Sequence, residues 1–321
     1  MAENTTIEWC DHTWTLVVGC NPVSPACAKC YAALMAARLE AMGHDKYRGL
    51  ATRAGNIGKW TGEVRFDESV LDLPLRTRKP GRWFLTSMGD IAHEKVTDTQ
   101  IAAAFGVMAQ AERHTFMVLT KRIERFASLL TGPILRNVFI GCTAENQAQA
   151  DAHRPHMETL AARGWNTFVS YESALGPVNW AGWEFLQQLI SGGESGNEAR
   201  PSHPDWHRAA RDFALKHKIA YLFKQWGAWG TAAFNASTGL PVFRQFPNYQ
   251  SWVNKGSTWV RGGICLDTDG RELENGGDMA RARDEGKFPV TIMHKVGKKA
   301  AGRLLDGVEH NGFPHAGACS P

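Results

Sequence analysis

The chain has 321 residues, of which 43% are hydrophobic and 21% are charged, and its 36 Lys and Arg against 32 Asp and Glu give a formal net charge of +4. This composition is typical of a folded protein and excludes a mainly disordered chain. No run of about 18 apolar residues occurs, and the first residues lack the basic-then-apolar order of a secretory signal, so we expect a soluble, cytoplasmic protein without a membrane partner.

Seven short runs rich in β-branched and aromatic residues predict the strands of the fold. Each run is mostly apolar at odd and even positions alike, which is typical of strands buried on both faces. In chain order the predicted strands are 15–18, 83–86, 116–119, 137–140, 167–170, 188–191 and 219–223. Amphipathic stretches long enough for helices lie between most of them, at 31–42, 97–111, 122–130, 145–162 and 204–217. The alternation predicts an α/β fold, a partial or full (β/α) barrel with parallel strands.

The alternation of predicted strands and helices does not continue into residues 227–321. These residues hold 15 of the 32 glycines, scattered tryptophans and no clear helix. We therefore predict two parts, a barrel over residues 1–226 and an irregular appendage over residues 227–321 that contributes to binding substrate or nucleic acid.

Three of the seven cysteines, Cys20, Cys27 and Cys30, lie within eleven residues and follow the first predicted strand. An odd number of cysteines without an export signal does not indicate a disulfide framework. Three thiolates from one loop can bind an iron–sulfur cluster and leave one iron open to a substrate or cofactor. A structural zinc site would need a fourth ligand, for example Cys10 or His12, and ordinary unligated cysteines are the third alternative. The position of the loop favours the cluster.

The segment Cys27-Ala-Lys-Cys30-Tyr31 resembles the cluster loop of the radical S-adenosylmethionine superfamily, which lies at the top of the first strand of a partial barrel. The usual loop of that superfamily is Cys-x3-Cys-x2-Cys, whereas six residues separate Cys20 from Cys27 here. More of the chain resembles a phage- and bacterium-associated family with this longer spacing. The segments that carry this resemblance are 6–9 with 13–14, 87–90, 119–122, 193–196 with 199–201, and 223–227.

The resemblance implies a [4Fe–4S] cluster and S-adenosylmethionine as cofactors and an external one-electron reductant. Reductive cleavage of S-adenosylmethionine would give methionine and a 5′-deoxyadenosyl radical that takes hydrogen from a substrate. A phage-encoded member would act in the cytoplasm of the host.

The loops that follow the predicted strands meet at one edge of the sheet and supply the remaining candidates. By resemblance, Asp90 or the carbonyls of Met88 and Gly89 would accept from the cofactor ammonium. Thr143, Glu145 and Asn146 would hold the ribose hydroxyls, and the glycine-rich turn 192–196 would contact the adenine. The cofactor-binding candidates are Tyr31, Met88, Gly89, Asp90, Thr143, Glu145, Asn146, Gly192, Gly193 and Glu194. Gly89-Asp90 is also an ordinary helix-entry turn, and Glu145 and Asn146 are common in the first turn of a helix.

Three charged residues at the same edge are the candidates for catalysis: Lys121, Glu172 and Lys224. Lys121 and its neighbour Arg122 could pair with a carboxylate or phosphate, or could lie solvated on the surface. Glu172 follows an apolar strand, and a carboxylate there needs a partner. Lys224 ends the last predicted strand and would face the same cavity.

The basic run 294–303, together with Trp229, Trp252 and Trp259, suits a nucleic-acid groove, although a solvated basic tail explains it equally. We expect a DNA or nucleotide substrate and favour modification or rearrangement of a modified nucleobase in phage DNA, with isomerase, lyase and transferase chemistry left open. One alternative is a DNA-repair lyase similar to photoproduct lyase, with Cys142 as a hydrogen donor at the rim. The other is a zinc-stabilised nucleic-acid-binding protein without catalysis.

Overall fold

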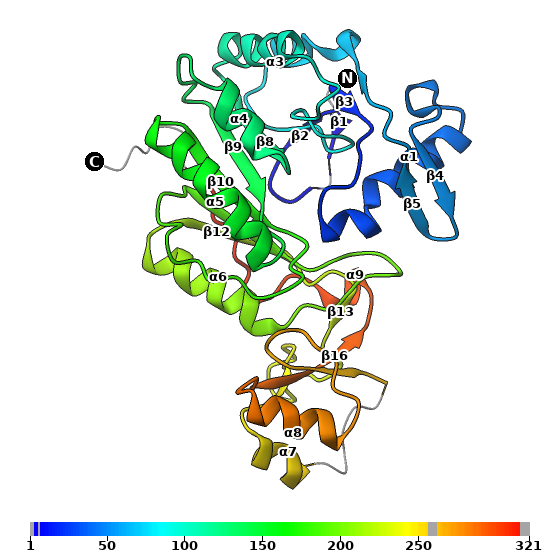
Figure 1. Ribbon diagram of the computed structural model, residues 1–321, viewed down its shortest axis with the longest axis vertical. Coiled ribbons are helices and arrows are strands. Elements are labelled where there is room, and N and C mark those ends of the chain that lie inside the picture. Colours follow the sequence, from blue (N-terminus) through cyan, green and yellow to red (C-terminus); the bar gives the residue numbers. More distant parts are fainter. Residues whose placement is uncertain (1–2, 6, 256–261, 315–321) are drawn as a thin grey trace.

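A computed structural model describes residues 3–5, 7–255 and 262–314 of the chain. Its main sheet has eight strands in the order β1-β2-β7-β8-β9-β10-β11-β12, and β2 to β12 run parallel while β1 is antiparallel to β2. These strands are β1 (Glu3–Asn4), β2 (His12–Trp14), β7 (Arg82–Leu85), β8 (Thr115–Thr120), β9 (Val138–Thr143), β10 (Asn166–Tyr171), β11 (Gln188–Gly192) and β12 (Ala220–Gln225). The sheet curls into a half-barrel (Figure 1), which confirms the predicted α/β class and the partial (β/α) barrel.

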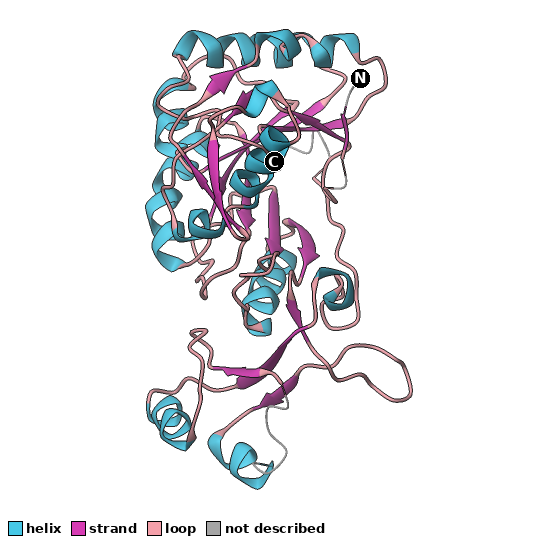
Figure 2. Ribbon diagram, turned by 90° about the vertical axis from the view of Figure 1, so that its right-hand side faces the viewer, coloured by secondary structure: helices cyan, strands magenta, loops and turns pink. Residues whose placement is uncertain are grey.

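Helices cover the outer face of this sheet (Figure 2). They are α3 (Asp98–Gln110), α4 (Ile123–Leu129), α5 (Gln147–Ala162) and α6 (Pro204–Lys216), with the short α2 (Leu73–Arg76) nearby. Because side chains alternate along a strand, Trp83 and Leu85 of β7 pack under the helices while Phe84 points to the concave face. The concave face carries its own apolar cluster, formed by Trp9, Cys10, Phe84, Met117, Phe139, Phe168, Ile190 and Leu222.

The first predicted strand, 15–18, is wrong in its bounds. The parallel strand β2 ends at Trp14, and the chain then leaves the sheet to form β3 (Val17–Val18), which pairs antiparallel with β6 (Arg65–Phe66). The cysteine loop therefore follows β3 and leads through the 3-10 helix η1 (Pro25–Lys29) into α1 (Tyr31–Ala41).

A hairpin between α1 and β7 was not predicted from the sequence. It consists of β4 (Ala51–Ala54) and β5 (Ile57–Trp60), and the short 3-10 helices η2 (Asp45–Tyr47) and η3 (Glu68–Val70) flank it. The hairpin packs on α1 so closely that a Cβ at Gly58 would lie 2.1 Å from the backbone nitrogen of Leu34. The strands are short and half exposed, so they lack the apolar runs that mark the main sheet.

The expectation that residues 227–321 hold no clear helix is wrong. The described part of this segment contains α7 (Tyr249–Lys255), α8 (Gly276–Asp284) and α9 (Lys298–Ala301), with β13 (Trp229–Gly230), β14 (Arg244–Phe246) and β15 (Ile264–Leu266) paired on β16 (Val290–Lys295). Helix α8 buries only Met279 and Ala282, which explains why its polar sequence gives little sign of a helix.

The appendage has a separate apolar cluster around Phe246, Met279 and Ile292 and lies at the far end of the molecule (Figure 1). The chain then returns to the barrel, where the amide of Phe223 donates to the carbonyl of His310 (3.0 Å) and the amide of Gly312 donates to the carbonyl of Tyr221 (2.8 Å). The end of the described chain thus pairs with the edge strand β12, and the division at residue 226 stays a prediction.

The longest helices of the fold cover the sheet and carry many polar residues. Over the residues that the structure describes, none combines the length and the apolar character needed to cross a bilayer.

Candidate functional site

The cysteine loop lies against the carboxyl end of β7. The amide of Gly19 donates to the carbonyl of Met88 (3.0 Å), and Gly19 forms an isolated parallel bridge with Gly89. A Cβ at Gly89 would lie 2.6 Å from the carbonyl oxygen of Val17, so only glycine lets the two segments approach this closely. Tyr31 is 60% exposed, and its hydroxyl donates to the carbonyl of Ser87 (2.9 Å). The predicted cofactor contacts Tyr31, Met88 and Gly89 therefore fasten the loop to the sheet.

The three clustered cysteines are half-buried and free of disulfides. A guanidinium nitrogen of Arg122 lies 3.7 Å from Sγ of Cys20, and Oγ of Ser24 lies 3.4 Å from Sγ of Cys27. Burial and the nearby Asp90 raise the pKa of Cys20 to about 11. Burial also disfavours the Cys27 thiolate, but the Lys121 ammonium and hydrogen bonds outweigh it and lower the pKa of Cys27. Arg122 and Lys121 thus lie close to Cys20 and Cys27, where their positive charges stabilise thiolates.

In the described ranges, no three Cys, His, Asp or Glu side chains are grouped so that they could hold one metal ion. The proposed fourth zinc ligands lie elsewhere: Cys10 belongs to the concave apolar cluster, and the ring of His12 packs 4.6 Å from that of Trp83. A closed zinc site needs ligands that converge on a single ion. In a cubane cluster each cysteine binds a different iron, so its ligands stand farther apart. Three free cysteines on one loop fit that donor set better than they fit zinc.

Asp90 is buried beside this loop and has four protein donors. Its Oδ1 accepts from Oγ1 of Thr120 (2.6 Å) and from the amide of Ala92 (3.0 Å). Its Oδ2 accepts from the guanidinium of Arg122 (2.9 Å) and from the amide of Lys121 (3.2 Å). The carboxylate therefore orients Arg122 toward Cys20, and its role as an acceptor for a cofactor ammonium stays a prediction.

Glu145 is fully buried at the end of β9 and reaches the cysteine loop. Its Oε1 accepts from the hydroxyl of Ser24 (2.6 Å) and from the ammonium of Lys121, and its Oε2 accepts from the amide of Ala26 (2.9 Å). The side chain of the next residue, Asn146, caps α5 by accepting from the amide of Gln149 (3.1 Å).

Thr143 is also buried, and its carbonyl lies 2.8 Å from Nδ1 of His153. Asn146 therefore lies at the start of a helix, as the alternative interpretation predicts, and Glu145 binds the cysteine loop through its hydrogen bonds. The expectation that Thr143, Glu145 and Asn146 hold a ribose stays a prediction.

The glycine-rich turn after β11 contains a buried carboxylate, Glu194, that pairs with the partly exposed Arg200. The two carboxylate oxygens of Glu194 accept from Arg200 at 2.6 and 2.9 Å, and Arg200 also donates to the carbonyl of Pro25 (3.2 Å) in the cysteine loop. A Cβ at Gly193 would lie 2.1 Å from the carbonyl oxygen of Trp226, so this turn is packed against the end of β12. Arg200 was not among the candidates, although it lies in a segment that carries the family resemblance.

Glu172 and Lys224 meet on the concave face of the sheet. Their side chains follow Phe168 and Leu222 at even spacing, which places them on the face of the concave apolar cluster. Oε1 of Glu172 lies 2.7 Å from Nζ of Lys224, and the two side chains are 18% and 17% exposed. Two of the predicted catalytic residues are therefore brought together, while the third, Lys121, lies beside Glu145 and the cysteines.

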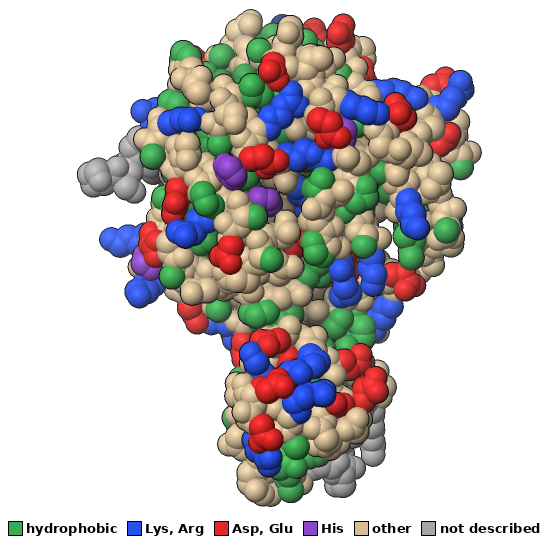
Figure 3. All heavy atoms as spheres, in the orientation of Figure 1, with side chains coloured by type: hydrophobic (Ala, Val, Ile, Leu, Met, Phe, Trp, Pro, Cys, Tyr) green, Lys and Arg blue, Asp and Glu red, His purple; other side chains and the backbone are tan. Residues whose placement is uncertain are grey.

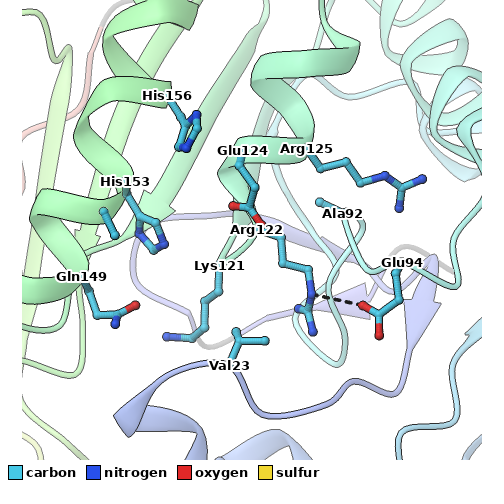
Figure 4. A pocket seen from close by; sticks show the side chains of 11 residues that line it. Val23, Ala92, Glu94, Lys121, Arg122, Glu124, Arg125, Gln149, His153 and His156 are labelled. Carbon is cyan, nitrogen blue, oxygen red and sulfur yellow. Dashed lines mark ion pairs between the residues drawn. The ribbon is translucent and has the colours of Figure 1, made fainter.

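A cavity of about 470 Å³ opens beside the cysteine loop, between α4 and α5 (Figure 4). Its wall carries both charges, including Lys121, Arg122, Glu94 and Glu124, and the rings of His153 and His156 extend from α5 toward it. A second cavity, of about 390 Å³, lies between the cysteine loop and the appendage and is lined by Pro25, Arg200, Trp229 and Leu266 among others.

Cys142 does not lie at the rim. It points to the outer face of β9, is completely buried in the core under the helices, and has a raised pKa because of that burial. The expectation that it could serve as a hydrogen donor at the rim is wrong, because β9 continues through Cys142 to Thr143 instead of ending at residue 140, and Cys142 shares the face of Val138 and Ile140 under the helices.

Comparison with known proteins gives one family and several solved structures. A family model described as a protein of unknown function (DUF5131) matches residues 4–314. No curated protein matches the chain.

The solved structures that match are spore photoproduct lyases. One mutant shares 10% identity with a TM-score of 0.38, over 67% of this chain and 64% of its own, so the chain spans just under two thirds of that protein. The lyase complexed with dinucleoside spore photoproduct shares 9% identity with a TM-score of 0.36, over 67% of this chain and 64% of its own. A further mutant shares 9% identity with a TM-score of 0.41, over 90% of this chain and 77% of its own. At these values the likenesses do not establish an activity for this chain.

Proposed function

The chain belongs to the DUF5131 family, and we propose that it is a radical S-adenosylmethionine enzyme within that family. The observation that carries this proposal is the placement of Cys20, Cys27 and Cys30, three free thiols on one loop at the carboxyl end of a parallel half-barrel. The carboxyl ends of parallel strands are where α/β folds place their chemistry. These three cysteines would hold a [4Fe–4S] cluster.

When bound, the cluster and S-adenosylmethionine, with one electron from an external reductant, supply a 5′-deoxyadenosyl radical. This chain contributes the surroundings. The concave apolar cluster, with Phe84, Phe139 and Phe168, covers the concave face of the half-barrel and would exclude water from a substrate bound against that face. Glu172 and Lys224 present a carboxylate and an ammonium to a polar group of the substrate.

We further propose that the substrate is a nucleobase in DNA or a nucleotide, in a modification or rearrangement that could serve phage DNA. The support is the basic run 294–303, which is part of β16 and α9 rather than a tail. Nζ of Lys295 donates to the carbonyl of Asn197 and Nζ of Lys29 donates to the carbonyl of Glu198, so both cations lie at the loop after β11. Lys298 is 57% exposed, and Lys and Arg side chains gather beside α9 in the space-filling view (Figure 3).

Of the three tryptophans named with this run, the two in the described part of the chain do not share one site. The indole of Trp229 donates to the carbonyl of Ala199 (2.7 Å), and its ring lines the second cavity. Trp252 lies in α7 against the separate core of the appendage, and Trp259 lies outside the described residues. Of the two that the structure describes, Trp229 is the one near the cysteine loop, where it could stack on a bound base.

Anaerobic reconstitution tests the central proposal. The wild-type chain should bind about four irons with sulfide and absorb broadly near 400 nm, as clusters of this class do. With S-adenosylmethionine and dithionite it should release 5′-deoxyadenosine, detected by mass spectrometry. Replacing Cys20, Cys27 or Cys30 with Ala should abolish both, whereas Cys319→Ala, at a cysteine outside the described residues, should not. A colourless protein with one zinc and no sulfide would overturn the proposal in favour of a zinc-stabilised nucleic-acid-binding protein.

A DNA-repair lyase remains the alternative with the same cofactors. Incubating the reconstituted protein with undamaged DNA and with ultraviolet-damaged DNA, followed by nucleoside mass spectrometry, separates the two. A new nucleoside from undamaged DNA supports modification, and loss of a photoproduct alone supports repair.

A further inference from the structure

The interval between Cys20 and Cys27 is six residues long, and side chains that follow four strands of the main sheet hold it. In a loop of this length each residue must lose conformational freedom before the three cysteines can bind one cluster. The structure shows which contacts impose that order, and all of them depend on a buried carboxylate.

The first contact is made by Arg122 and Asp90. The Arg122 guanidinium donates to the side-chain oxygen of Asn21 and to its backbone carbonyl (3.3 Å). The same guanidinium is fixed by Asp90, whose side chain is 7% exposed. Asp90 lies after β7 and Arg122 after β8, so two neighbouring strands hold the start of the interval.

The second contact is direct. Glu145, whose side chain is 1% exposed, accepts from the hydroxyl of Ser24 and from the amide of Ala26. Two hydrogen bonds to one charged acceptor fix the start of η1, and bonds of this kind are stronger than neutral ones. The carboxylate lies 119 residues from Ala26 along the chain.

The third contact is made by Arg200 and Glu194. Glu194 is buried and grips Arg200 through both carboxylate oxygens, and Arg200 donates to the carbonyl of Pro25. This pair comes from the loop after β11, whereas Asp90 follows β7, and three strands lie between β7 and β11 in the sheet. The interval is thus held from both sides and from the middle.

We propose that Asp90, Glu145 and Glu194 are positioning residues that preform the long cysteine interval before a cluster binds. Preformed order removes an entropic cost that cluster binding would otherwise meet. The part of this inference that concerns the cluster rests on the proposed function, whereas the order of the loop does not. It also gives a reason why this chain can use a spacing of six residues where the resembling superfamily uses three.

Glu145→Gln is the central test, because it keeps the shape of the side chain and removes its charge. In the metal-free protein, amide hydrogen exchange over residues 20–30 should become about tenfold faster, the effect of losing one hydrogen bond to a charged acceptor. Ser24→Ala removes one of the same bonds from the loop side without changing a buried residue, and should produce a smaller increase in the same peptide. Glu158→Gln, at a carboxylate of α5 whose side chain is 45% exposed, is the matched control and should leave this exchange unchanged.

Two further readouts separate the possible failures. When iron is limiting during reconstitution, the amount that Glu145→Gln incorporates should differ from wild type, and so should the electron paramagnetic resonance spectrum of the reduced variant. The thermal unfolding midpoint of Ser24→Ala should stay close to that of the wild type. Unchanged exchange in Ser24→Ala and in a folded Glu145→Gln would overturn the inference. A wild-type protein that binds no iron would overturn the proposed function instead, and the exchange data would still decide whether the loop is preformed.

Discussion

Glu172 and Lys224 form an ion pair across the intervening strand β11, with 2.7 Å between Oε1 and Nζ. Gly192 of β11 lies between the two side chains, and a Cβ there would lie 3.5 Å from Cβ of Lys224 and 3.6 Å from Cγ of Glu172. These are ordinary van der Waals distances, so the pair does not require a glycine at this position. It depends instead on the two strands that flank β11, because Glu172 follows β10 and Lys224 lies in β12.

Breaking this pair should reduce turnover of the substrate while sparing the cluster. We expect Glu172→Gln and Lys224→Met each to lower turnover about a hundredfold or more, the range for loss of a positioned acid or base. Iron content and uncoupled cleavage of S-adenosylmethionine should remain. Glu158→Gln, in the exposed pair with Arg154, is the control and should have no effect. Normal turnover in both site variants would remove the pair from the active site.

The sheet and its outer helices could be predicted from the sequence because each strand is an apolar run and each helix an amphipathic stretch. The predicted strand 116–119 lies within β8, and the predicted helix 204–217 ends one residue beyond α6. The rule that loops at the carboxyl ends of strands share one edge also anticipated that Glu172 and Lys224 lie close together, whereas their catalytic role stays a prediction. These signals are local, so one sequence is enough to show them.

The contacts that shape the site are not local. Ser24 and Glu145 are 121 residues apart, and nothing in either segment indicates the other. Cys142 was misplaced for a related reason, because the sequence of a strand buried on both faces does not show which face is which. The polar helix α8 was missed because few of its side chains are buried, so its periodicity is weak.

Gly89→Ala should displace the cysteine loop from the sheet. The new methyl group would lie 2.6 Å from the carbonyl oxygen of Val17 and 3.0 Å from that of Gly19, so the backbone must shift. We expect reduced iron content and a lower thermal midpoint. Gly106→Ala is the matched control, because it lies within α3 with open space around it and should stabilise the helix by up to about 1 kcal/mol. Equal iron content in both variants would contradict this account of Gly89.

Acid should destabilise the fold through His207. Its ring is buried between Oγ of Ser191 (2.6 Å) and Oγ of Ser202 (2.8 Å), and burial lowers its pKa to about 3. In the unfolded chain His207 binds a proton near the ordinary histidine pKa of 6.5, whereas in the folded chain it does not. The contribution of His207 to the free energy of unfolding is therefore fully present above pH 6.5 and is lost as the pH falls toward 3. This one site should contribute a slope of about 1.4 kcal/mol per pH unit.

Urea unfolding of the wild type and of His207→Gln at several pH values between 7 and 4 measures that slope. The variant should be less stable at pH 7 but should lose stability more slowly as the pH falls. His44→Gln, at an exposed histidine, should match the wild type in slope. Identical slopes in His207→Gln and the wild type would show that the ring is protonated in the folded chain.

The basic run should bind nucleic acid through phosphates. Because phosphate contacts release counterions, the affinity for duplex DNA should fall with salt by a log–log slope of about 0.9 for each contact. Replacing Lys295, Lys298 and Lys299 together with Ala should weaken binding and flatten that slope, yet leave uncoupled cleavage of S-adenosylmethionine unchanged. The triple variant Arg78→Ala, Lys79→Ala and Lys216→Ala removes the same charge from exposed positions near the opposite ends of the strands and should leave the slope intact. If both triple variants behave alike, net charge rather than this surface governs binding, and a small-molecule substrate held by Glu172 and Lys224 becomes the better account.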